Sequence, residues 1–277
     1  EAVVQRRLQD RDSLDALFGE LVHLRHRMAQ NAGFSDYRAY AFRALGRWDY
    51  TPEDCLSFHA AVEEHITPLL SALHEDRRRR LGVERLRPWD LEVDPEGRPP
   101  LRPFTHGREL AHKAQELFER LHPELGAQFR FLVERGLLDL ESRKGKAPGG
   151  YQATFDERRW PFLFMNAAGL SADVRTLVHE AGHAFHTLAV RAEVLLSYRH
   201  APTEFSEVAS MGMEVLSLPH WDVFYPEAED RRRARREFFG GVVRLLPWVA
   251  TVDAFQHRVY AQPELDPEAR RRTWVEV

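Results

Sequence analysis

Apolar residues recur at helical spacing through most of the N-terminal half of the chain. We expect helices at about 12–30, 35–45, 52–80, 105–122 and 123–136. Thr51 is a typical helix cap, Pro52 suits a first helical position, and Pro68 is expected to kink the helix that they begin. The stretch 86–104 contains five prolines and is expected to be a loop or connector.

The spacing changes in the second half. Alternation of apolar and polar residues at 151–155 and an apolar run at 160–165 predict two strands joined by a turn. Helices are expected at 171–190, with Ser171 as cap, at about 202–214, and at 227–262 with interruptions at 240–241 and 247. The pattern predicts a mainly α protein with a small β-hairpin or sheet, divided into a helical lobe at 1–142 that forms one wall of a cleft and a second region at 143–277.

Composition narrows the possible functions. A net charge of -4 and a pI of about 6.4 give no electrostatic reason to expect a nucleic-acid partner, and the arginine runs at 77–80 and 231–236 are interpreted as solvated helix ends. No apolar run approaches 18 residues, so no membrane partner is expected. Cys55 is the single cysteine, which fits a reducing compartment and predicts a cytoplasmic location. Oligomeric state is not set by these features.

The predicted helix at 171–190 contains His179-Glu-Ala-Gly-His183, an H-E-x-x-H pattern. Residues four apart share a helix face, so His179 and His183 can offer two imidazoles to one metal ion. Glu180 lies one step round the helix and can reach a metal-bound water as general base. Catalytic zinc also needs a third protein ligand and an open position. A helix with two surface or core histidines would give the same pattern without a metal.

A third ligand is expected from the following helix. His186 and Ala189 stand where an H-E-x-x-H-x-x-G-x-x-H pattern requires glycine and histidine, so that type of site is excluded. Glu204 and Glu207 both remain candidates from the residues alone.

Three polar residues are placed to support such a site. Ser210 and Glu214 share a helix face with the candidate ligand Glu207 and are candidates to orient a ligand histidine, as is His186, which lies three residues after His183. Catalytic zinc keeps its fourth position open, which argues against His186 as a ligand. Plain helix packing is the alternative for all three.

These motifs together resemble the zinc peptidases of the thimet oligopeptidase and oligoendopeptidase F type. The resemblance rests on His179–His186 and Glu204–Glu214, and extends to 31–34, 49–55, 143–151, 161–166 and 253–260. It implies a zincin-like helical peptidase with the small sheet beside the zinc-binding helix. It also implies one Zn2+ per chain held by His179, His183 and Glu207, with Glu180 moving a proton from zinc-bound water to the leaving amine. Short peptides are the implied substrates, because the family encloses its site in a deep helical channel.

The strand before the zinc-binding helix can bind substrate as an added β-strand along its free edge. We expect this edge at 162–166, continuing into 167–169, so that substrate contacts come from Phe164, Met165, Asn166 and Ala167. A purely structural hairpin is the alternative.

Two other functions remain open, a carboxypeptidase-like zincin and an inactive peptide-binding relative. The resemblance assigns oxyanion stabilisation to tyrosine and histidine side chains on a later segment, which we expect beyond Val277 rather than at His257 or Tyr260. The chain opens on Glu1 instead of Met, and residues 270–277 are typical of the start of a helix, so we expect the chain to lack both termini. These 277 residues alone are expected to bind zinc yet cleave peptides poorly or not at all.

Overall fold

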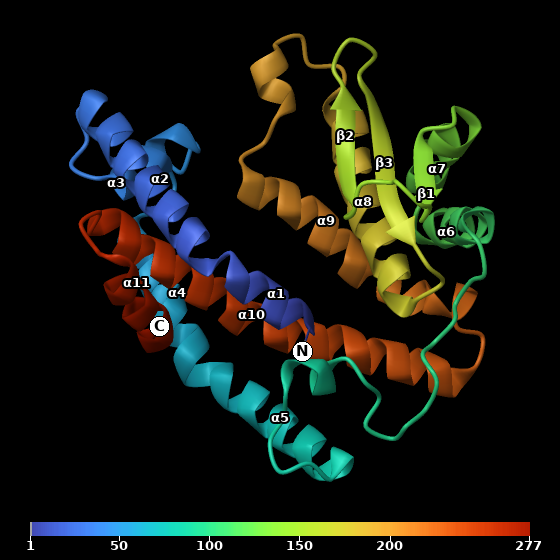
Figure 1. Cartoon of the computed structure of the whole chain (residues 1–277). Helices are drawn as coiled ribbons and strands as arrows, with labels where there is room; N and C mark the ends of the chain where they lie inside the picture. The colour runs from blue at the N-terminus through green and yellow to red at the C-terminus, as the bar shows by residue number, and fades with distance from the viewer. Residues whose placement is uncertain (1) are drawn as a thin grey trace. The chain divides into compact units, whose positions relative to one another are not determined.

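A computed structural model describes residues 2–277, and Glu1 lies outside the described residues. The helices are α1 (Ala2–Gln9), α2 (Arg11–Asn31), α3 (Tyr37–Ala44), α4 (Pro52–His65), α5 (Thr67–Leu81), α6 (Gly107–Leu121), α7 (Pro123–Glu134), α8 (Ser171–Val190), α9 (Thr203–Ser217), α10 (Ala228–Ala261) and α11 (Pro267–Glu276). Short 3-10 helices are η1 (Pro88–Leu91), η2 (Leu196–Arg199) and η3 (Leu218–Val223). The strands are β1 (Leu138–Glu141), β2 (Tyr151–Phe155) and β3 (Trp160–Ala167). The predicted fold class, mainly α with a small sheet beside the H-E-x-x-H helix, is confirmed (Figure 1).

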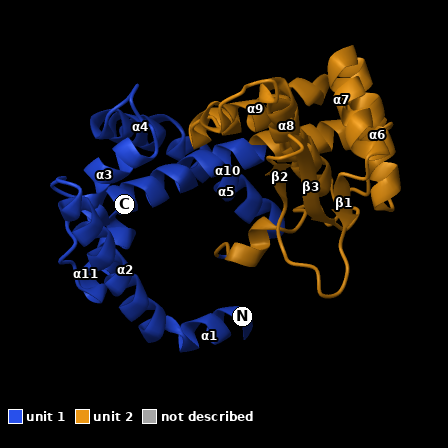
Figure 2. Ribbon diagram, turned by 90° about the horizontal axis from the view of Figure 1, so that it is seen from above, with its two compact units in different colours: residues 1–84, 240–277 blue, residues 85–239 orange. Residues whose placement is uncertain are grey.

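The chain divides into two compact units, drawn in two colours in Figure 2. Unit 1 comprises the chain up to Glu84 together with 240–277, and unit 2 comprises 85–239. Helix α10 therefore contributes residues to both units. The limits of the two units differ from the predicted division into 1–142 and 143–277. That division stays a prediction.

One helix predicted in unit 1 needs correction. The helix expected at 52–80 is two helices, because Pro68 has no N–H to continue the hydrogen-bond ladder and instead occupies the first turn of α5. Thr51 caps α4 as expected, with its hydroxyl accepting from the Asp54 amide at 3.3 Å and the Asp54 carboxylate accepting from the Thr51 amide at 2.8 Å.

Helix α10 is longer and more regular than predicted. It runs for 34 residues through the glycines at 240–241 and through Pro247, where interruptions were expected. A proline removes only one ladder hydrogen bond, so the turns on either side can keep the helix continuous. An 18-residue window of α10 has a mean hydropathy of 1.4 and is 11% buried, so length and composition alone would allow this helix to cross a membrane. Such a helix is weak support for a membrane span, and the expected absence of a membrane partner stays a prediction.

The sheet of unit 2 has the order β1-β3-β2, with β1 parallel and β2 antiparallel to the central strand β3. Side chains on β3 alternate between buried and half-buried positions, and α8 packs against this strand. The core beside them is aromatic: the Phe118 ring lies 4.9 Å from that of Phe185 on α8 and 5.0 Å from that of Phe129 on α7. This core fixes the position of α8, which carries the H-E-x-x-H motif.

The start of α8 differs in detail from the prediction. Leu170 is the cap position, and the Asp173 carboxylate accepts hydrogen bonds from the amides of Ala168 and Leu170, both at 2.8 Å. Ser171, the predicted cap, is the first helical residue, and its hydroxyl lies 2.7 Å from that of Tyr225.

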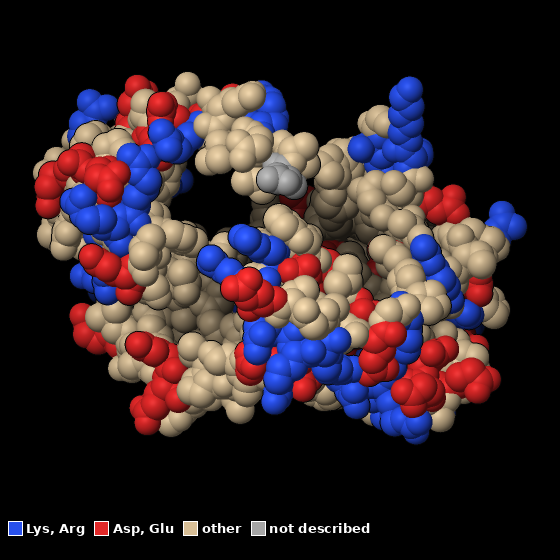
Figure 3. Space-filling view, turned by 60° about the horizontal axis from the view of Figure 1, so that its bottom comes forward, with Lys and Arg blue, Asp and Glu red and all other residues tan. Residues whose placement is uncertain are grey.

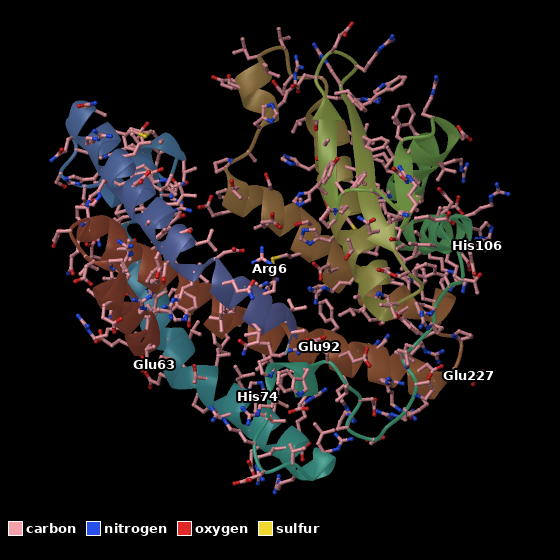
Figure 4. All side chains as sticks on the ribbon, in the orientation of Figure 1. Arg6, Glu63, His74, Glu92, His106 and Glu227 are labelled. Carbon is pink, nitrogen blue, oxygen red and sulfur yellow. The ribbon has the colours of Figure 1, made fainter. Side chains whose placement is uncertain are left out.

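Helix α6 begins on a histidine cap: His106, labelled in Figure 4, accepts through Nδ1 from the Glu109 amide at 3.1 Å.

Charged side chains of both signs are interspersed on the face drawn in Figure 3. Within the two arginine runs, Arg78 donates to Glu75 at 2.8 Å and Arg232 donates through Nε to Glu229 at 3.1 Å. These contacts join residues three apart, and the first run is a largely solvated helix end, as expected. The second run is only partly solvated: the Arg233 side chain is 11% exposed and pairs with Asp94 at 3.1 Å, and Arg235 donates to the Leu218 carbonyl oxygen at 2.8 Å.

Helices α8 and α9 come into backbone contact at Gly182. A Cβ on this residue would lie 2.6 Å from the Ser210 Cα and 2.7 Å from the Ala209 carbonyl oxygen. Atoms cannot be that close, so glycine is required for this spacing. The H-E-x-x-H helix is thus held unusually near the helix that follows it.

Gly182→Ala is expected to lower the free energy of unfolding by about 1–3 kcal/mol, because the added methyl group overpacks the crossing. Gly212→Ala is the matched control on α9, since a Cβ there would meet no atom within 4 Å; it should be neutral or stabilise by up to about 1 kcal/mol. Urea unfolding of the two variants measures the difference, and equal stabilities would show that the crossing tolerates a side chain.

Lys146 joins the loop after β1 to the sheet. Its side chain is only 1% exposed, and Nζ donates to the carbonyl oxygens of Asp139, Glu141 and Met165 and to the Asp139 carboxylate at 3.0 Å. Arg143 and Lys146 hold the pKa of Asp139 near 2.

Lys146→Met is expected to lower the free energy of unfolding by about 1–3 kcal/mol, because it leaves the part-buried Asp139 carboxylate and Met165 carbonyl oxygen without their donor. The exposed Lys144 provides the matched control, and Lys144→Met should change stability by less than about 0.5 kcal/mol. Thermal unfolding of both variants measures this contrast, which a similar loss in the two proteins would contradict.

Candidate metal centre

Three donor groups from α8 and α9 converge. His179 Nε2 lies 3.3 Å from Glu207 Oε2, and His183 Nε2 lies 3.7 Å from Glu207 Oε1. The two imidazole rings are nearly perpendicular, with centroids 5.0 Å apart. The ligand atoms of the three residues all lie within 4.8 Å of one another, which is the spacing that a single ion needs. The predicted ligand set is therefore brought together.

A second layer of side chains orients these donors. His179 Nδ1 lies 2.7 Å from Glu214 Oε1, and the other oxygen of this buried carboxylate lies 3.2 Å from Arg175 Nε. The hydrogen bond to Glu214 raises the pKa of His179 and places the proton on Nδ1. Nε2 is then the atom that faces Glu207. The buried Ser210 hydroxyl donates to Glu207 Oε2 at 2.9 Å. Glu214 therefore orients a ligand histidine as predicted, whereas Ser210 supports the ligand carboxylate instead of a histidine.

His183 and His186 have different surroundings. Burial lowers the pKa of His183, which favours the neutral imidazole that a metal requires. His186 is half-buried, and its charge also lowers the pKa of His183. It does not belong to the group of converging ligand atoms. Glu204, the alternative third ligand, is also outside this group.

Glu180 lies beside the three donors. It is only 8% exposed, and burial raises the pKa of its carboxyl group. The main chain of Gln152 on β2 forms a hydrogen bond with this carboxyl group. Glu180 also lines an open cavity of about 430 Å³. The residues around this cavity are Gly150, Tyr151, Gln152, His179, Glu180, His183, Ser206 and Glu207.

The predicted substrate edge along β3 is wrong. β3 is the central strand: Phe164 is paired with Tyr151 on one side and with Asp139 on the other. Met165 and Ala167 are buried, and Lys146 donates to the Met165 carbonyl oxygen. The side-chain amide nitrogen of Asn166 donates to the carbonyl oxygens of Ala147 and Gly149, both at 2.9 Å.

The strand that borders the cavity is β2, whose residues Tyr151 and Gln152 were not proposed as site residues. Their strand was predicted from its alternation. The role of β2 was missed because the four-residue strand β1 was not predicted. β1 covers one edge of β3 and β2 covers the other, so β2 lies at the edge of the described sheet.

His257 and Tyr260, to which no catalytic role was given, both belong to unit 1. His257 is 6% exposed and lies near Asp253, with its Nε2 3.4 Å from that carboxylate. Tyr260 accepts a hydrogen bond from Arg25 and packs against Tyr37 at a ring distance of 4.9 Å. These contacts support the structural roles that the sequence suggested.

Known proteins resemble this chain over different lengths. An oligoendopeptidase F from Lactococcus lactis subsp. cremoris, the chromosomal form, is 27% identical over 150 residues, which is 54% of this chain and 24% of that protein. The plasmid form is 26% identical over 185 residues, covering 65% of this chain and 29% of that protein.

Solved structures match nearly the whole chain. Pz peptidase A with an inhibitor superposes with a TM-score of 0.89 at 34% identity, over 96% of this chain and 47% of that one. A Bacillus anthracis protein assigned as an oligoendopeptidase F gives 0.88 at 31%, over 97% and 49%. An Enterococcus faecium oligoendopeptidase F gives 0.59 at 18%, over 99% and 41%, which supports the fold alone. The chain spans about half the length of these solved structures. The sequence model of peptidase family M3 matches residues 1–277, and the chain therefore belongs to this family.

Proposed function

We propose that the protein is a zinc-dependent endopeptidase that hydrolyses short peptides. The convergence of His179, His183 and Glu207 beside a buried carboxyl group in an open cavity carries this proposal. Membership of peptidase family M3 supports metallopeptidase activity, and similarity to the Lactococcus oligoendopeptidases F supports an oligopeptidase. Because the chain spans about half of its solved relatives, activity and substrates are proposed for the whole protein.

The donor set fits zinc. Two imidazole nitrogens and one carboxylate, with the second nitrogen of His179 held by Glu214, are ligands and support typical of catalytic zinc. Bound zinc would polarise the scissile carbonyl and make water more acidic. The family is zinc-dependent, which agrees with this choice of ion.

Glu180 is proposed as the general base and then the general acid. Burial raises the pKa of the Glu180 carboxyl group toward neutral pH. A carboxyl group with such a pKa can accept a proton and later give it back. Glu180 takes a proton from the attacking water, whose oxygen forms a bond to the scissile carbonyl carbon. The carbon–nitrogen bond then breaks, and Glu180 passes the proton to the leaving amine nitrogen.

β2 is proposed to position the peptide. Gly150, Tyr151 and Gln152 line the cavity, and β2 is paired only with β3 in the described sheet. An extended peptide added beside β2 would be held by main-chain hydrogen bonds and would lie next to Glu180. This mode of binding accepts many peptide sequences, which fits an oligopeptidase.

Product analysis separates the alternatives. An endopeptidase cleaves inside a peptide, a carboxypeptidase-like enzyme releases one or two residues from the C-terminus, and a peptide-binding relative returns its ligand intact. A cytoplasmic location and the absence of nucleic-acid and membrane partners remain predictions from composition.

The metal ligands can be tested one at a time. His179→Ala, His183→Ala and Glu207→Ala are each expected to lose the ion, because catalytic zinc keeps only three protein ligands. Glu204→Ala is the control on the same helix and should keep the zinc content of the unaltered chain, whereas each ligand variant should hold one zinc ion fewer. Elemental analysis after dialysis gives the metal content. A zinc content that is unchanged in Glu207→Ala but lower by one ion in Glu204→Ala would move the third ligand.

The proposed base is tested by Glu180→Gln. This variant keeps the size and hydrogen bonding of the side chain but cannot take a proton, so kcat should fall at least ~100-fold. Zinc content should stay near that of the unaltered enzyme, because Glu180 is outside the ligand group. Hydrolysis of a quenched fluorescent peptide by the full-length enzyme measures the loss. Substantial activity in a zinc-loaded Glu180→Gln enzyme would rule out this mechanism.

A further inference from the structure

Unit 1 contains a second cluster of metal-binding side chains. Cys55, Asp253 and His257 place one ligand atom each within 4.8 Å of the others. All three belong to unit 1, whereas the H-E-x-x-H motif belongs to unit 2. None of them has a part in the proposed peptidase reaction.

The cluster is built on two helix faces. Cys55 and His59 are four residues apart on α4, and Asp253 and His257 are four residues apart on α10. Each pair therefore lies on one face of its helix. The exposed Glu63, labelled in Figure 4, lies on α4 one turn after His59. His59 Nε2 is 2.8 Å from Asp253 Oδ2, so this histidine holds the carboxylate from the side of α4.

Both histidines have unused nitrogen atoms. Nδ1 of His59 and Nδ1 of His257 are buried and find no hydrogen-bond partner among the described residues. The His257 side chain is 6% exposed. A buried imidazole nitrogen without a partner is costly in an ordinary protein core, whereas in a metal site such a nitrogen can bind the ion.

The charges favour a divalent cation over a nucleophilic cysteine. Burial raises the pKa of Cys55, and the nearby Asp253 raises it further, so the thiol is not activated for attack. A metal ion would bind the thiolate and displace its proton. A thiolate and a carboxylate together neutralise a divalent ion, and Arg47 is the nearby cation that opposes binding.

We propose that Cys55, Asp253 and His257 form a second zinc site that joins α4 to α10, with His59 positioning Asp253. Sulfur, imidazole nitrogen and carboxylate oxygen are all zinc ligands, and a thiolate disfavours calcium and magnesium. The ion would hold together two segments of unit 1 that are far apart in the sequence. Its ligands are different residues from those of the candidate peptidase centre.

Cobalt(II) titration of the chain tests this site. Cobalt replaces zinc in such sites and gives a thiolate-to-metal charge-transfer band, and Cys55 is the single cysteine of the sequence, so the band reports this site alone. The band should appear in the unaltered chain and in Glu207→Ala, and it should be absent from Cys55→Ser and His257→Ala. His59→Ala should weaken cobalt binding about 10- to 100-fold.

His65→Ala is the matched control, because His65 is exposed on the same helix and should leave the band unchanged. Circular dichroism confirms that each variant is folded. Zinc should also protect Cys55 from alkylation, and this protection should be lost in His257→Ala. Absence of the band from the unaltered chain, or an equally strong band in His257→Ala, would overturn the proposal.

Discussion

The close crossing of α8 and α9 is the constraint on which the candidate metal centre depends. His179 and His183 share a face because of their spacing, but an ion also needs Glu207 from a different helix. The contact of Gly182 with Ala209 and Ser210 brings the backbone of α9 within reach. A side chain at residue 182 would push the helices apart at the level of the ligands, so this glycine has a geometric role in the motif.

The same crossing places the supporting groups. Ser210, which Gly182 contacts, also donates a hydrogen bond to Glu207, and Glu214 lies farther along α9 against His179. On the opposite side, β2 approaches the Glu180 carboxyl group. Glu180 is outside the group of ligand atoms that contains Glu207, so one carboxylate can bind metal while the other handles protons.

Sequence reasoning succeeded where the determinants are local. The limits of α8 and the common face of His179 and His183 follow from helical spacing, and the predicted helix was 171–190 as observed. Glu207 was chosen over Glu204 only through the family resemblance. The strand order could not be predicted, because β1 is only four residues long and pairs in parallel with β3, a strand distant in the sequence. Helix α10 also continues through residues 240–241 and Pro247, where the local signals of glycine and proline predicted interruptions.

Anomalous diffraction at the zinc absorption edge, from crystals of the zinc-loaded protein, would test the central claim most directly. The account predicts a peak within about 2.0–2.2 Å of His179 Nε2, His183 Nε2 and a Glu207 carboxylate oxygen, with a position left open toward Glu180. A peak bound by Glu204 in place of Glu207, or a site closed by His186 as a fourth ligand, would contradict it.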